Sequence, residues 1–480
     1  MTLAALALSC LAAAPSADWP QSRHDTQNSA STILEAPASG RPRPWTFEGS
    51  GRVWGYEPGM TVWSSPALAV VDGRAVLAIG SYDKNLYVLD AARGELLWKL
   101  TTGAGVYAAP ALWRDGERTF LFATSSDRLV YALDAASGAR AWIYSVEEYR
   151  PTLGGAQLEA PCVGEVRAAP AVFVSYWVWD RSLGHNLQRA GVVALGARDG
   201  KRLWRTELGD NAMTAPLFAR PRGRPVLFVG SSNGSLVALD ADDGRVLWRA
   251  TELDAIRGAP AFVELPDGPR VIMASKFGAV RALDALTGEE RWRFKTGDRV
   301  TGAPAILSHG GRSRALVGSY DRRLYALDAA SGALAWSFAA RGGFFSSPAL
   351  ADLPGGPLVL ASAWDHGLHA LSAETGALVS TTFTGRPLWD VAGLDDSNWS
   401  SPVAAQVNGE WMAYLGSYDG SLRAISLEPS RNEGAALRSN GLFWLSFPLS
   451  LAPVAGLALA LTRRARRRSA GSGDRAEGSR

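Results

Sequence analysis

The sequence predicts an all-β protein, an eight-bladed β-propeller, followed by a single C-terminal transmembrane helix. Three observations support this fold class. A unit of about 44 residues recurs along the 480-residue chain, most units end in a Gly-to-Trp strand, and an uncharged apolar stretch follows the last unit. Repeats of this length, built from short strands and turns, are typical of propeller blades.

The N-terminus has the pattern of a secretory signal. Residues 2–14 are apolar and small residues follow them, although no Lys or Arg precedes the run. This pattern predicts a signal peptide over residues 1–17. Cys10 follows Ala-Leu-Ser, a poor match to a lipidation site. Once the signal is removed, Cys162 is the only cysteine left, so an internal disulfide is not expected.

Each unit opens with small residues and a proline. The eight prolines that mark the units are Pro66, Pro110, Pro170, Pro216, Pro260, Pro304, Pro348 and Pro402. The spacing widens before Pro170 and before Pro402, which predicts an insertion at each place. The eight units predict a propeller over residues 18–430.

Each unit then continues with strands and turns in a fixed order. An apolar strand follows the proline, then an Asp or Asn turn, a strand such as Leu-Tyr-Ala-Leu-Asp, and a Gly turn. A tryptophan follows that glycine by four residues in most units, and a large aromatic at this position is expected to pack between neighbouring blades. The predicted docking tryptophans are Trp98, Trp142, Trp204, Trp248, Trp292 and Trp336.

The eighth unit lacks this last strand, and the N-terminus supplies a replacement. The segment 44–49, Pro-Trp-Thr-Phe-Glu-Gly, resembles the Trp strand at 291–297. We therefore expect the strand around Trp45 to complete blade eight and to close the ring, which removes exposed sheet edges. Trp45 would be a seventh docking tryptophan.

The repeat resembles that of a known superfamily. Leu283–Trp292, LDALTGEERW, is similar to the tryptophan-docking repeat of the quinoprotein β-propellers, and residues 18–32 resemble their N-terminal segment. The resemblance implies the fold but not an activity. The superfamily contains calcium-dependent alcohol dehydrogenases that carry pyrroloquinoline quinone, and non-catalytic propellers of the outer-membrane assembly machinery. The chain resembles the non-catalytic members more.

One set of residues has the pattern of a ligand site. The residues three positions before each proline are expected to form one ring around the central channel: Trp63, Tyr107, Arg167, Met213, Arg257, Thr301, Phe345 and Trp399. Aromatic faces on one side and two arginines opposite suit a flat anionic ligand. By the resemblance, pyrroloquinoline quinone with calcium is such a ligand. The alternative is that these bulky side chains plug the channel.

The sequence offers little for catalysis or nucleic-acid binding. Adjacent cysteines, a CxxCH motif and nucleophile or phosphate-loop motifs are absent, so no catalytic residues are expected. His366 and His369 are spaced to lie on opposite faces of a strand, so no metal site is expected. Residues 463–480 carry seven Arg against two acids, which leaves the rest of the chain slightly acidic. A broad basic surface for nucleic acid is therefore excluded.

The C-terminus predicts a membrane anchor. After a linker at 431–440, residues 441–462 carry no charge, which is long enough for a transmembrane helix. The Arg-rich tail at 463–480 predicts a cytoplasmic C-terminus and a propeller outside the cytoplasm.

Two functions fit these expectations. The first is a membrane-anchored, non-catalytic scaffold that binds envelope proteins and needs no cofactor. The second is a membrane-bound quinoprotein oxidoreductase that holds pyrroloquinoline quinone in the central channel.

Overall fold

The computed structural model describes residues 31–35, 42, 44–48, 64–146, 156–179, 188–209, 213–365, 367–383, 400–416 and 421–427. The chain divides into two units, 1–427 and 428–480, and all described residues belong to the first. In this described part, no helix has the length and apolar character to span a bilayer. The predicted signal peptide, linker, anchor and tail lie outside the described residues.

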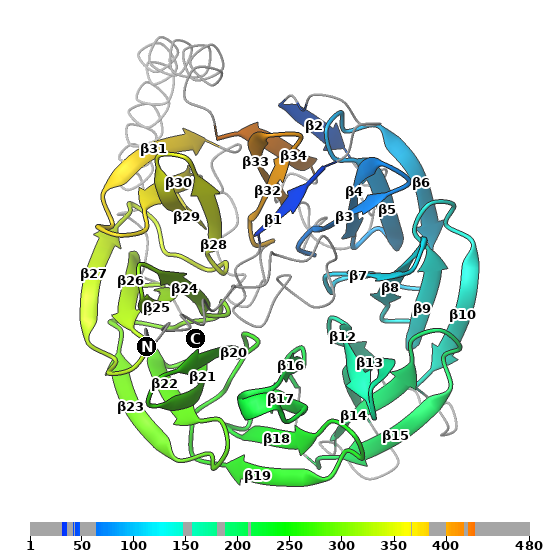
Figure 1. Ribbon diagram of the computed structural model, residues 1–480, viewed down its shortest axis with the longest axis horizontal. Helices are drawn as coiled ribbons and strands as arrows, with labels where there is room; N and C mark the ends of the chain where they lie inside the picture. Colours follow the sequence, from blue (N-terminus) through cyan, green and yellow to red (C-terminus); the bar gives the residue numbers. More distant parts are fainter. Residues whose placement is uncertain are drawn as a thin grey trace, which may run out of the picture. The chain divides into compact units, whose positions relative to one another are not determined.

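The first unit is an all-β propeller in which eight sheets surround a central axis (Figure 1). Blade one contains β3 (Ala67–Val71), β4 (Arg74–Gly80), β5 (Asn85–Asp90) and β6 (Leu96–Thr101). Blade two contains β7 (Ala111–Asp115), β8 (Arg118–Thr124), β9 (Leu129–Asp134) and β10 (Arg140–Ser145). Blade three contains β11 (Ala156–Leu158), β12 (Cys162–Val166), β13 (Ala169–Trp179), β14 (Gln188–Gly196) and β15 (Arg202–Glu207).

Blades four to seven repeat the four-stranded antiparallel pattern. Blade four contains β16 (Leu217–Ala219), β17 (Val226–Gly230), β18 (Leu236–Asp240) and β19 (Val246–Ala250). Blade five contains β20 (Ala261–Leu265), β21 (Gly268–Ala274), β22 (Ala279–Asp284) and β23 (Glu290–Lys295). Blade six contains β24 (Ala305–His309), β25 (Arg312–Gly318), β26 (Arg323–Asp328) and β27 (Leu334–Ala339). Blade seven contains β28 (Ala349–Leu353), β29 (Gly356–Ser362), β30 (Gly367–Ser372) and β31 (Leu378–Phe383).

Blade eight is built from both ends of the propeller sequence. Its strands from the C-terminal side are β32 (Val403–Val407), β33 (Glu410–Gly416) and β34 (Ser421–Ser426). The strand β2 (Trp45–Glu48) pairs antiparallel with β34 as the outer strand, with Trp45 opposite Ala424. A further strand that the sequence did not predict, β1 (Ser31–Leu34), pairs parallel with the inner strand β32. The N-terminal segment therefore joins blade eight at both edges.

The blades are joined by a repeated tryptophan contact. In each of the first six blades the indole nitrogen donates a hydrogen bond to an alanine carbonyl of the next blade, over 2.9 to 3.1 Å. The ring also covers the turn glycine of that blade, as Trp248 covers Gly288. A Cβ added to Gly288 would lie 2.7 Å from the Trp248 ring. The glycine and the tryptophan of each unit therefore both take part in contacts between neighbouring blades. The side chain of Trp45 lies outside the described residues.

The small residues before each proline have a similar explanation. We call the stretch of chain that joins the outer strand of one blade to the inner strand of the next blade the leading segment of that next blade. Neighbouring blades approach each other closely along these segments. A Cβ on Gly258 would lie 2.6 Å from the backbone nitrogen of Ala303. Ala303 donates to Ser347 Oγ over 2.8 Å, and Ser347 N–H donates to Ser401 Oγ over 3.0 Å. Larger side chains at these positions would separate the blades.

Blade three corrects one predicted boundary. Its inner strand β12 follows Pro161, not Pro170, because Cys162–Val166 pairs with β13. Pro170 lies within β13, directly after the hairpin turn. The sequence favoured Pro170 because two alanines precede it, whereas Glu159 stands in the small-residue position before Pro161. The extra residues of blade three therefore lie on both sides of its inner strand.

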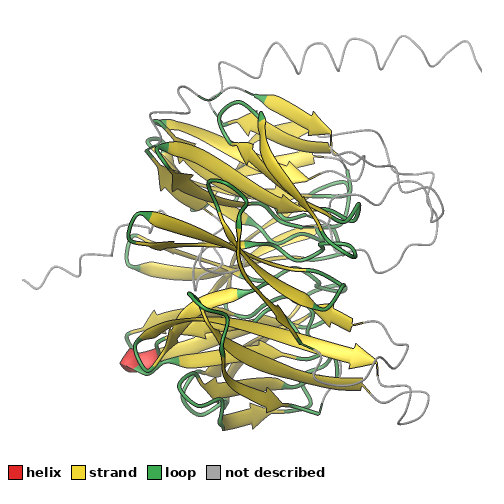
Figure 2. Ribbon diagram, turned by 90° about the vertical axis from the view of Figure 1, so that its right-hand side faces the viewer, coloured by secondary structure: helices red, strands yellow, loops and turns green. Residues whose placement is uncertain are grey.

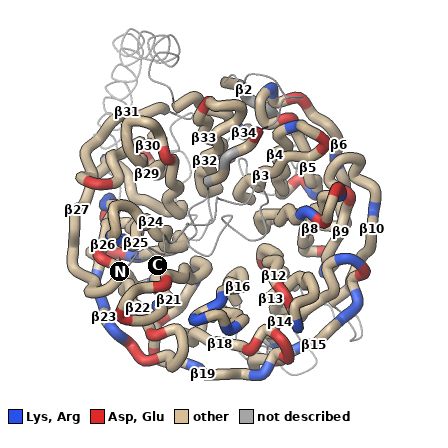
Figure 3. The backbone as a smooth tube through the Cα atoms, viewed as in Figure 1, with Lys and Arg blue, Asp and Glu red and all other residues tan. Residues whose placement is uncertain are grey.

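The single short helical segment among the described residues is the 3-10 turn η2 (Pro221–Gly223) in blade four (Figure 2). Charged residues gather on the outer strands and turns, whereas the strands nearest the axis are mostly uncharged (Figure 3). The exception is the arginine-rich segment beside β16.

Candidate functional site

The leading segments hold four of the expected ring residues at one end of the inner strands. Tyr107, Arg257, Thr301 and Phe345 precede the inner strands of blades two, five, six and seven. Thr301 Oγ1 donates to the carbonyl of Phe345 over 3.1 Å, which shows the two positions side by side. Arg257 is exposed, Tyr107 and Thr301 are half-buried, and Phe345 is buried. Trp63 and Trp399, the two other aromatic members, lie outside the described residues.

Arg167 does not belong to this ring, contrary to the prediction. It lies in the two-residue turn between β12 and β13, with a φ of 49°. That turn is at the opposite end of the inner strand from the leading segment. Its backbone N–H donates to Asp242 Oδ1 over 2.6 Å. The error follows from taking Pro170 as the repeat marker. The residue three before Pro161 is Leu158, which is buried.

Met213 also departs from the expected ring. It forms a β-bridge with Ser231, as Ile256 does with Ser275 and Phe344 with Ala363. Ile256 and Phe344 lie four residues before their prolines, whereas Met213 lies three before Pro216. The leading segment of blade four is therefore one residue shorter, and Met213 is buried in the blade core.

The most prominent feature at this end is an aromatic cluster of blades six and seven, formed by Tyr320, Phe345 and Trp364. Phe345 stacks on Trp364 with ring centroids 3.6 Å apart, and Tyr320 meets Phe345 edge-on at 4.1 Å. The guanidinium of Arg299 lies 4.5 Å from the centre of the Tyr320 ring. Trp364 is 44% exposed. The cluster therefore presents a flat apolar face beside a cation.

Aspartates in the turn after the second strand hold these segments in place. Asp321 accepts the Gly297 N–H over 2.6 Å and the Tyr325 hydroxyl over 2.6 Å. Burial and this hydrogen bond to Asp321 raise the pKa of Tyr325 to about 12. Asp127 of blade two makes the same two contacts, with the Gly103 N–H over 2.8 Å and with the Tyr131 hydroxyl over 2.6 Å. Side chains on the two segments are therefore pre-positioned.

Blade seven replaces that tyrosine with histidine. Nε2 of the buried His369 lies 3.0 Å from Asp365 Oδ1, and Nδ1 lies 2.9 Å from Thr381 Oγ1. Asp365 also accepts the Arg341 N–H over 3.1 Å. Burial acts to raise the pKa of Asp365, but the hydrogen bonds outweigh it and hold that pKa below its ordinary value. Since Asp365 follows Trp364 directly, this network supports the aromatic cluster. His366 lies outside the described residues.

A smaller aromatic pair lies at blades one and two. Tyr82 and Tyr107 meet edge-on with ring centroids 5.0 Å apart. Burial and the hydrogen bond with Tyr82 raise the pKa of Tyr107 above its ordinary value. The Tyr107 hydroxyl therefore remains neutral at physiological pH.

The leading segment of blade three contributes a carboxyl group that sequence reasoning missed. Glu159 stands where other blades have small residues, and its Oε1 accepts a hydrogen bond from Gln157 over 3.0 Å. Burial raises the pKa of Glu159 to about 7. The signal was present in the sequence: Glu159-Ala160-Pro161 is a repeat marker with an acid in a small-residue position.

The other missed residues follow the second strand of each blade. They stand two or three residues after that strand and are Tyr82, Phe277, Tyr320 and Trp364. Phe277 is 58% exposed. The repeated Gly-Ser-Tyr-Asp sequence carries this signal, because an aromatic residue stands directly before the Asp of the turn.

The alternative function needs a calcium site and cations beside the quinone, and both can be sought among the described residues. Within these ranges, no three His, Cys, Asp or Glu side chains come together in a way that could hold a metal ion. Calcium in proteins takes about six to eight oxygen ligands. Of the two arginines expected opposite the aromatic arc, Arg257 alone lies in a leading segment.

Comparison with known proteins identifies a family. The family model described as outer membrane protein assembly factor BamB matches residues 45–170, 188–272 and 276–432, which is most of the chain. No curated protein matches the chain.

Solved structures share the fold at low identity. A quinohemoprotein alcohol dehydrogenase from Comamonas testosteroni is 16% identical with a TM-score of 0.60, over 86% of this chain and 81% of that one. The quinohemoprotein alcohol dehydrogenase ADHIIG from Pseudomonas putida HK5 is 14% identical with a TM-score of 0.58, over 86% and 80%. Sqt1 from Saccharomyces cerevisiae is 11% identical with a TM-score of 0.57, over 81% and 99%. These likenesses show the fold alone.

Proposed function

Since the chain belongs to the outer membrane protein assembly factor BamB family of quinoprotein-like propellers, we propose that it is a non-catalytic scaffold that binds other proteins of the cell envelope. The aromatic cluster of blades six and seven carries this proposal. It exposes the flat ring of Trp364 on a support of buried residues and hydrogen-bonded turns. Exposed aromatic side chains on a rigid scaffold are typical of protein-binding surfaces.

The proposed setting is the extracytoplasmic side of a membrane. Residues 1–17 would direct export, residues 441–462 would anchor the chain, and the tail at 463–480 would remain in the cytoplasm. Single cysteines introduced by Arg312→Cys and by Ser472→Cys test this topology. An impermeant maleimide should label the first in intact cells and the second only after permeabilisation. Burial raises the pKa of the Cys162 thiol to about 12, so this cysteine adds little background.

Site-specific photo-crosslinking tests the binding role. A photoreactive phenylalanine analogue replaces Trp364 in one variant and Leu334 in a control. Leu334 is 50% exposed on the outer strand β27 of blade six. Discrete adducts with an envelope protein should form from position 364 and not from position 334. Equal adducts from both positions, or none from position 364, would contradict the proposal.

The quinone alternative is tested with the same protein. Pyrroloquinoline quinone is titrated with and without calcium while tryptophan fluorescence is followed. Saturable, calcium-dependent quenching that Arg257→Ala abolishes would make the oxidoreductase function the better one. The scaffold function predicts no such quenching.

A further inference from the structure

Arginines surround the aromatic cluster of blades six and seven. Arg322 lies in the turn between β25 and β26, and Arg341 lies in the leading segment of blade seven. Both side chains are exposed, and neither guanidinium has an ion pair or hydrogen bond within the described residues. Arg299 adds a third cation, since its guanidinium lies 4.5 Å from the centre of the Tyr320 ring. Because the chain before the Arg-rich tail is slightly acidic as a whole, this group of cations is a local feature.

Arg341 occupies a position that other blades give to glycine. The N–H that donates to the turn aspartate belongs to Gly103 in blade two and Gly297 in blade six, but to Arg341 in blade seven. Directly beside this contact, the Trp364 N–H donates to the Gly343 carbonyl over 2.9 Å. The arginine therefore stands next to the exposed tryptophan. The backbone contact itself does not require an arginine, because glycine makes it in two other blades.

Arg322 is adjacent to the same segment and is likewise not required by its turn. Its carbonyl accepts the N–H of Ala340, the residue before Arg341, over 2.9 Å. Gly278 makes the equivalent contact in blade five, where its carbonyl accepts the Thr296 N–H over 2.8 Å. The φ of Arg322 is 70°, in the left-handed region that favours glycine. The exposed charge at this position therefore needs an explanation other than the turn.

The acidic groups of the same segments are already engaged. Asp321 and Asp365 are half-buried, and each accepts two backbone N–H groups. A further hydrogen bond joins each to a side chain, that of Tyr325 and that of His369 respectively. Asp298 is the exposed acid of these segments, and it accepts a backbone N–H over 2.7 Å. Two unpaired guanidinium groups beside an aromatic face thus remain available to an acidic partner.

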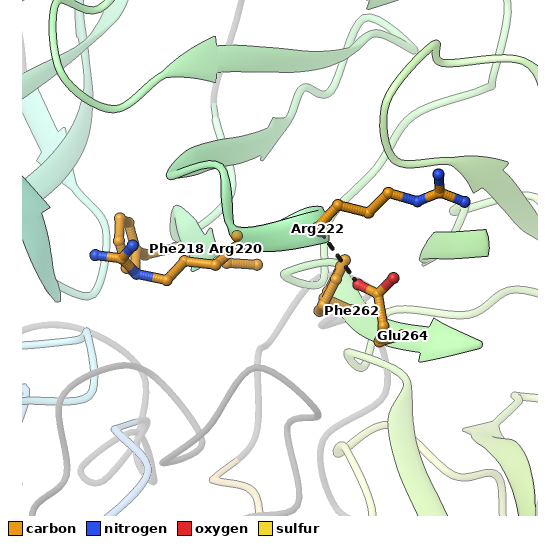
Figure 4. A pocket seen from close by; sticks show the side chains of 7 residues that line it. Phe218, Arg220, Arg222, Phe262 and Glu264 are labelled. Carbon is orange, nitrogen blue, oxygen red and sulfur yellow. Dashed lines mark hydrogen bonds between the residues drawn. The ribbon is translucent and has the colours of Figure 1, made fainter. Parts of the chain in front are cut away.

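The arginines beside β16 do not have such an arrangement. They line a pocket that β16, β20 and the irregular turn η2 form between blades four and five (Figure 4). Arg220 pairs with Glu165 over 2.5 Å and extends away from Arg222 in Figure 4. The Glu264 carboxylate lines the same pocket. An anion there would meet an acid and a cation that already has a partner, so this pocket carries no comparable site.

We propose that the aromatic cluster binds an extended acidic segment of its partner protein. An aromatic side chain of the segment lies on Trp364, and flanking Asp or Glu residues pair with Arg322 and Arg341. This inference rests on the proposed function and names the chemistry of the partner. Aromatic rings stack on flat ring faces, and arginine forms charge-assisted hydrogen bonds with carboxylates. Each residue of an extended chain advances by about 3.3 Å, so charges one or two residues from the aromatic residue lie within reach of an arginine side chain.

Three peptides test this chemistry. They are acetyl-Glu-Glu-Phe-Glu-Glu-amide, its uncharged form with Gln in place of Glu, and the acidic form with Ala in place of Phe. Binding to the full chain in phosphatidylcholine nanodiscs is measured by NMR relaxation of the acetyl methyl group, with empty nanodiscs as the blank. At low salt the acidic Phe peptide should bind about tenfold more tightly than either of the others, as for two exposed ion pairs. Its advantage over the uncharged peptide should shrink at about 0.5 M salt. Equal affinity of the acidic and uncharged Phe peptides at low salt, or no binding of the acidic one, would overturn the proposal.

Variants assign the preference to the two arginines. Arg322→Gln and Arg341→Gln should each reduce the preference for the acidic peptide, and the double variant should abolish it. Lys84→Gln is the matched control and should keep the preference. Lys84 is an exposed cation at the same turn position of blade one, with a φ of 71°. A preference that survives in the double variant would refute the assignment.

Photo-crosslinking from position 364 separates this inference from the proposed function. Adducts with an envelope protein should form in the wild-type background and weaken in the double arginine variant. Undiminished adducts in that variant would overturn the acidic segment and leave the scaffold function standing. No adducts in either background would count against the scaffold function, and the peptide titration then decides the acidic preference by itself.

Discussion

Glu159 is expected to lower the stability of the propeller as the pH rises, whereas most acidic residues have the opposite effect. Its carboxyl group lies in the leading segment of blade three, where burial raises its pKa from 4.5 to about 7. A carboxyl whose pKa is higher in the folded state keeps a proton that the unfolded chain releases. Stability therefore falls as pH rises from 4.5 to about 7, and the full penalty is present above that range.

The magnitude follows from the two pKa values. A difference of about 2.5 corresponds to roughly 3 kcal/mol at about 1.4 kcal/mol for each tenfold change. The side chain is partly exposed, so this figure is an upper bound. Glu159→Gln removes the charge and keeps an oxygen that accepts the hydrogen bond from Gln157. The variant should be more stable than the wild type by about 1–3 kcal/mol at pH 8, and similar to it at pH 4.

Equilibrium urea unfolding, followed by tryptophan fluorescence at several pH values, measures this difference. Glu117→Gln, a change at an exposed turn of blade two, is the control and should show no comparable gain at pH 8. A Glu159→Gln variant that gains nothing between pH 4 and pH 8 would show that the carboxyl is well solvated. The inference from burial would then be wrong.

Two further predictions concern the repeated contacts. Gly288→Ala places a methyl group 2.7 Å from the Trp248 ring at a φ of 77°, and should lower the unfolding free energy by about 2–4 kcal/mol. The control is Gly311→Ala, whose added methyl group meets nothing within 4 Å at a φ of 73°. It should lower the unfolding free energy by about 1 kcal/mol. Equal urea midpoints for the two variants would contradict the docking contact. Asp365→Asn removes the carboxylate paired with His369 and should destabilise the chain by about 1–3 kcal/mol at pH 7. Because the pKa of Asp365 is lowered in the folded state, the deficit should shrink as the pH falls toward 2, and a deficit that stays constant in thermal melts would count against this pairing.

The candidate site was less predictable than the fold, and blade three shows the reason. Both Pro161 and Pro170 follow an alanine, and the sequence alone favours Pro170 because two alanines precede it. Strand pairing decides for Pro161, which moves Arg167 to the far end of the inner strand. A one-residue deletion in blade four likewise sends Met213 into the core. A residue three positions before the proline therefore does not reach the ring in a blade whose leading segment has a different length.

The sequence by itself determined the architecture, because each repeat carries the chemistry of its own contacts. The Gly-to-Trp spacing encodes the docking of one blade on the next, and small residues before each proline allow the inner strands to approach. Eight such units require eight sheets. Tertiary structure alone decided which side chains meet. Phe345 and Trp364 are 19 positions apart and stack only because a leading segment crosses the turn of its own blade. The pocket at Arg222 arises where two blades meet beside an irregular turn, which no periodic pattern records.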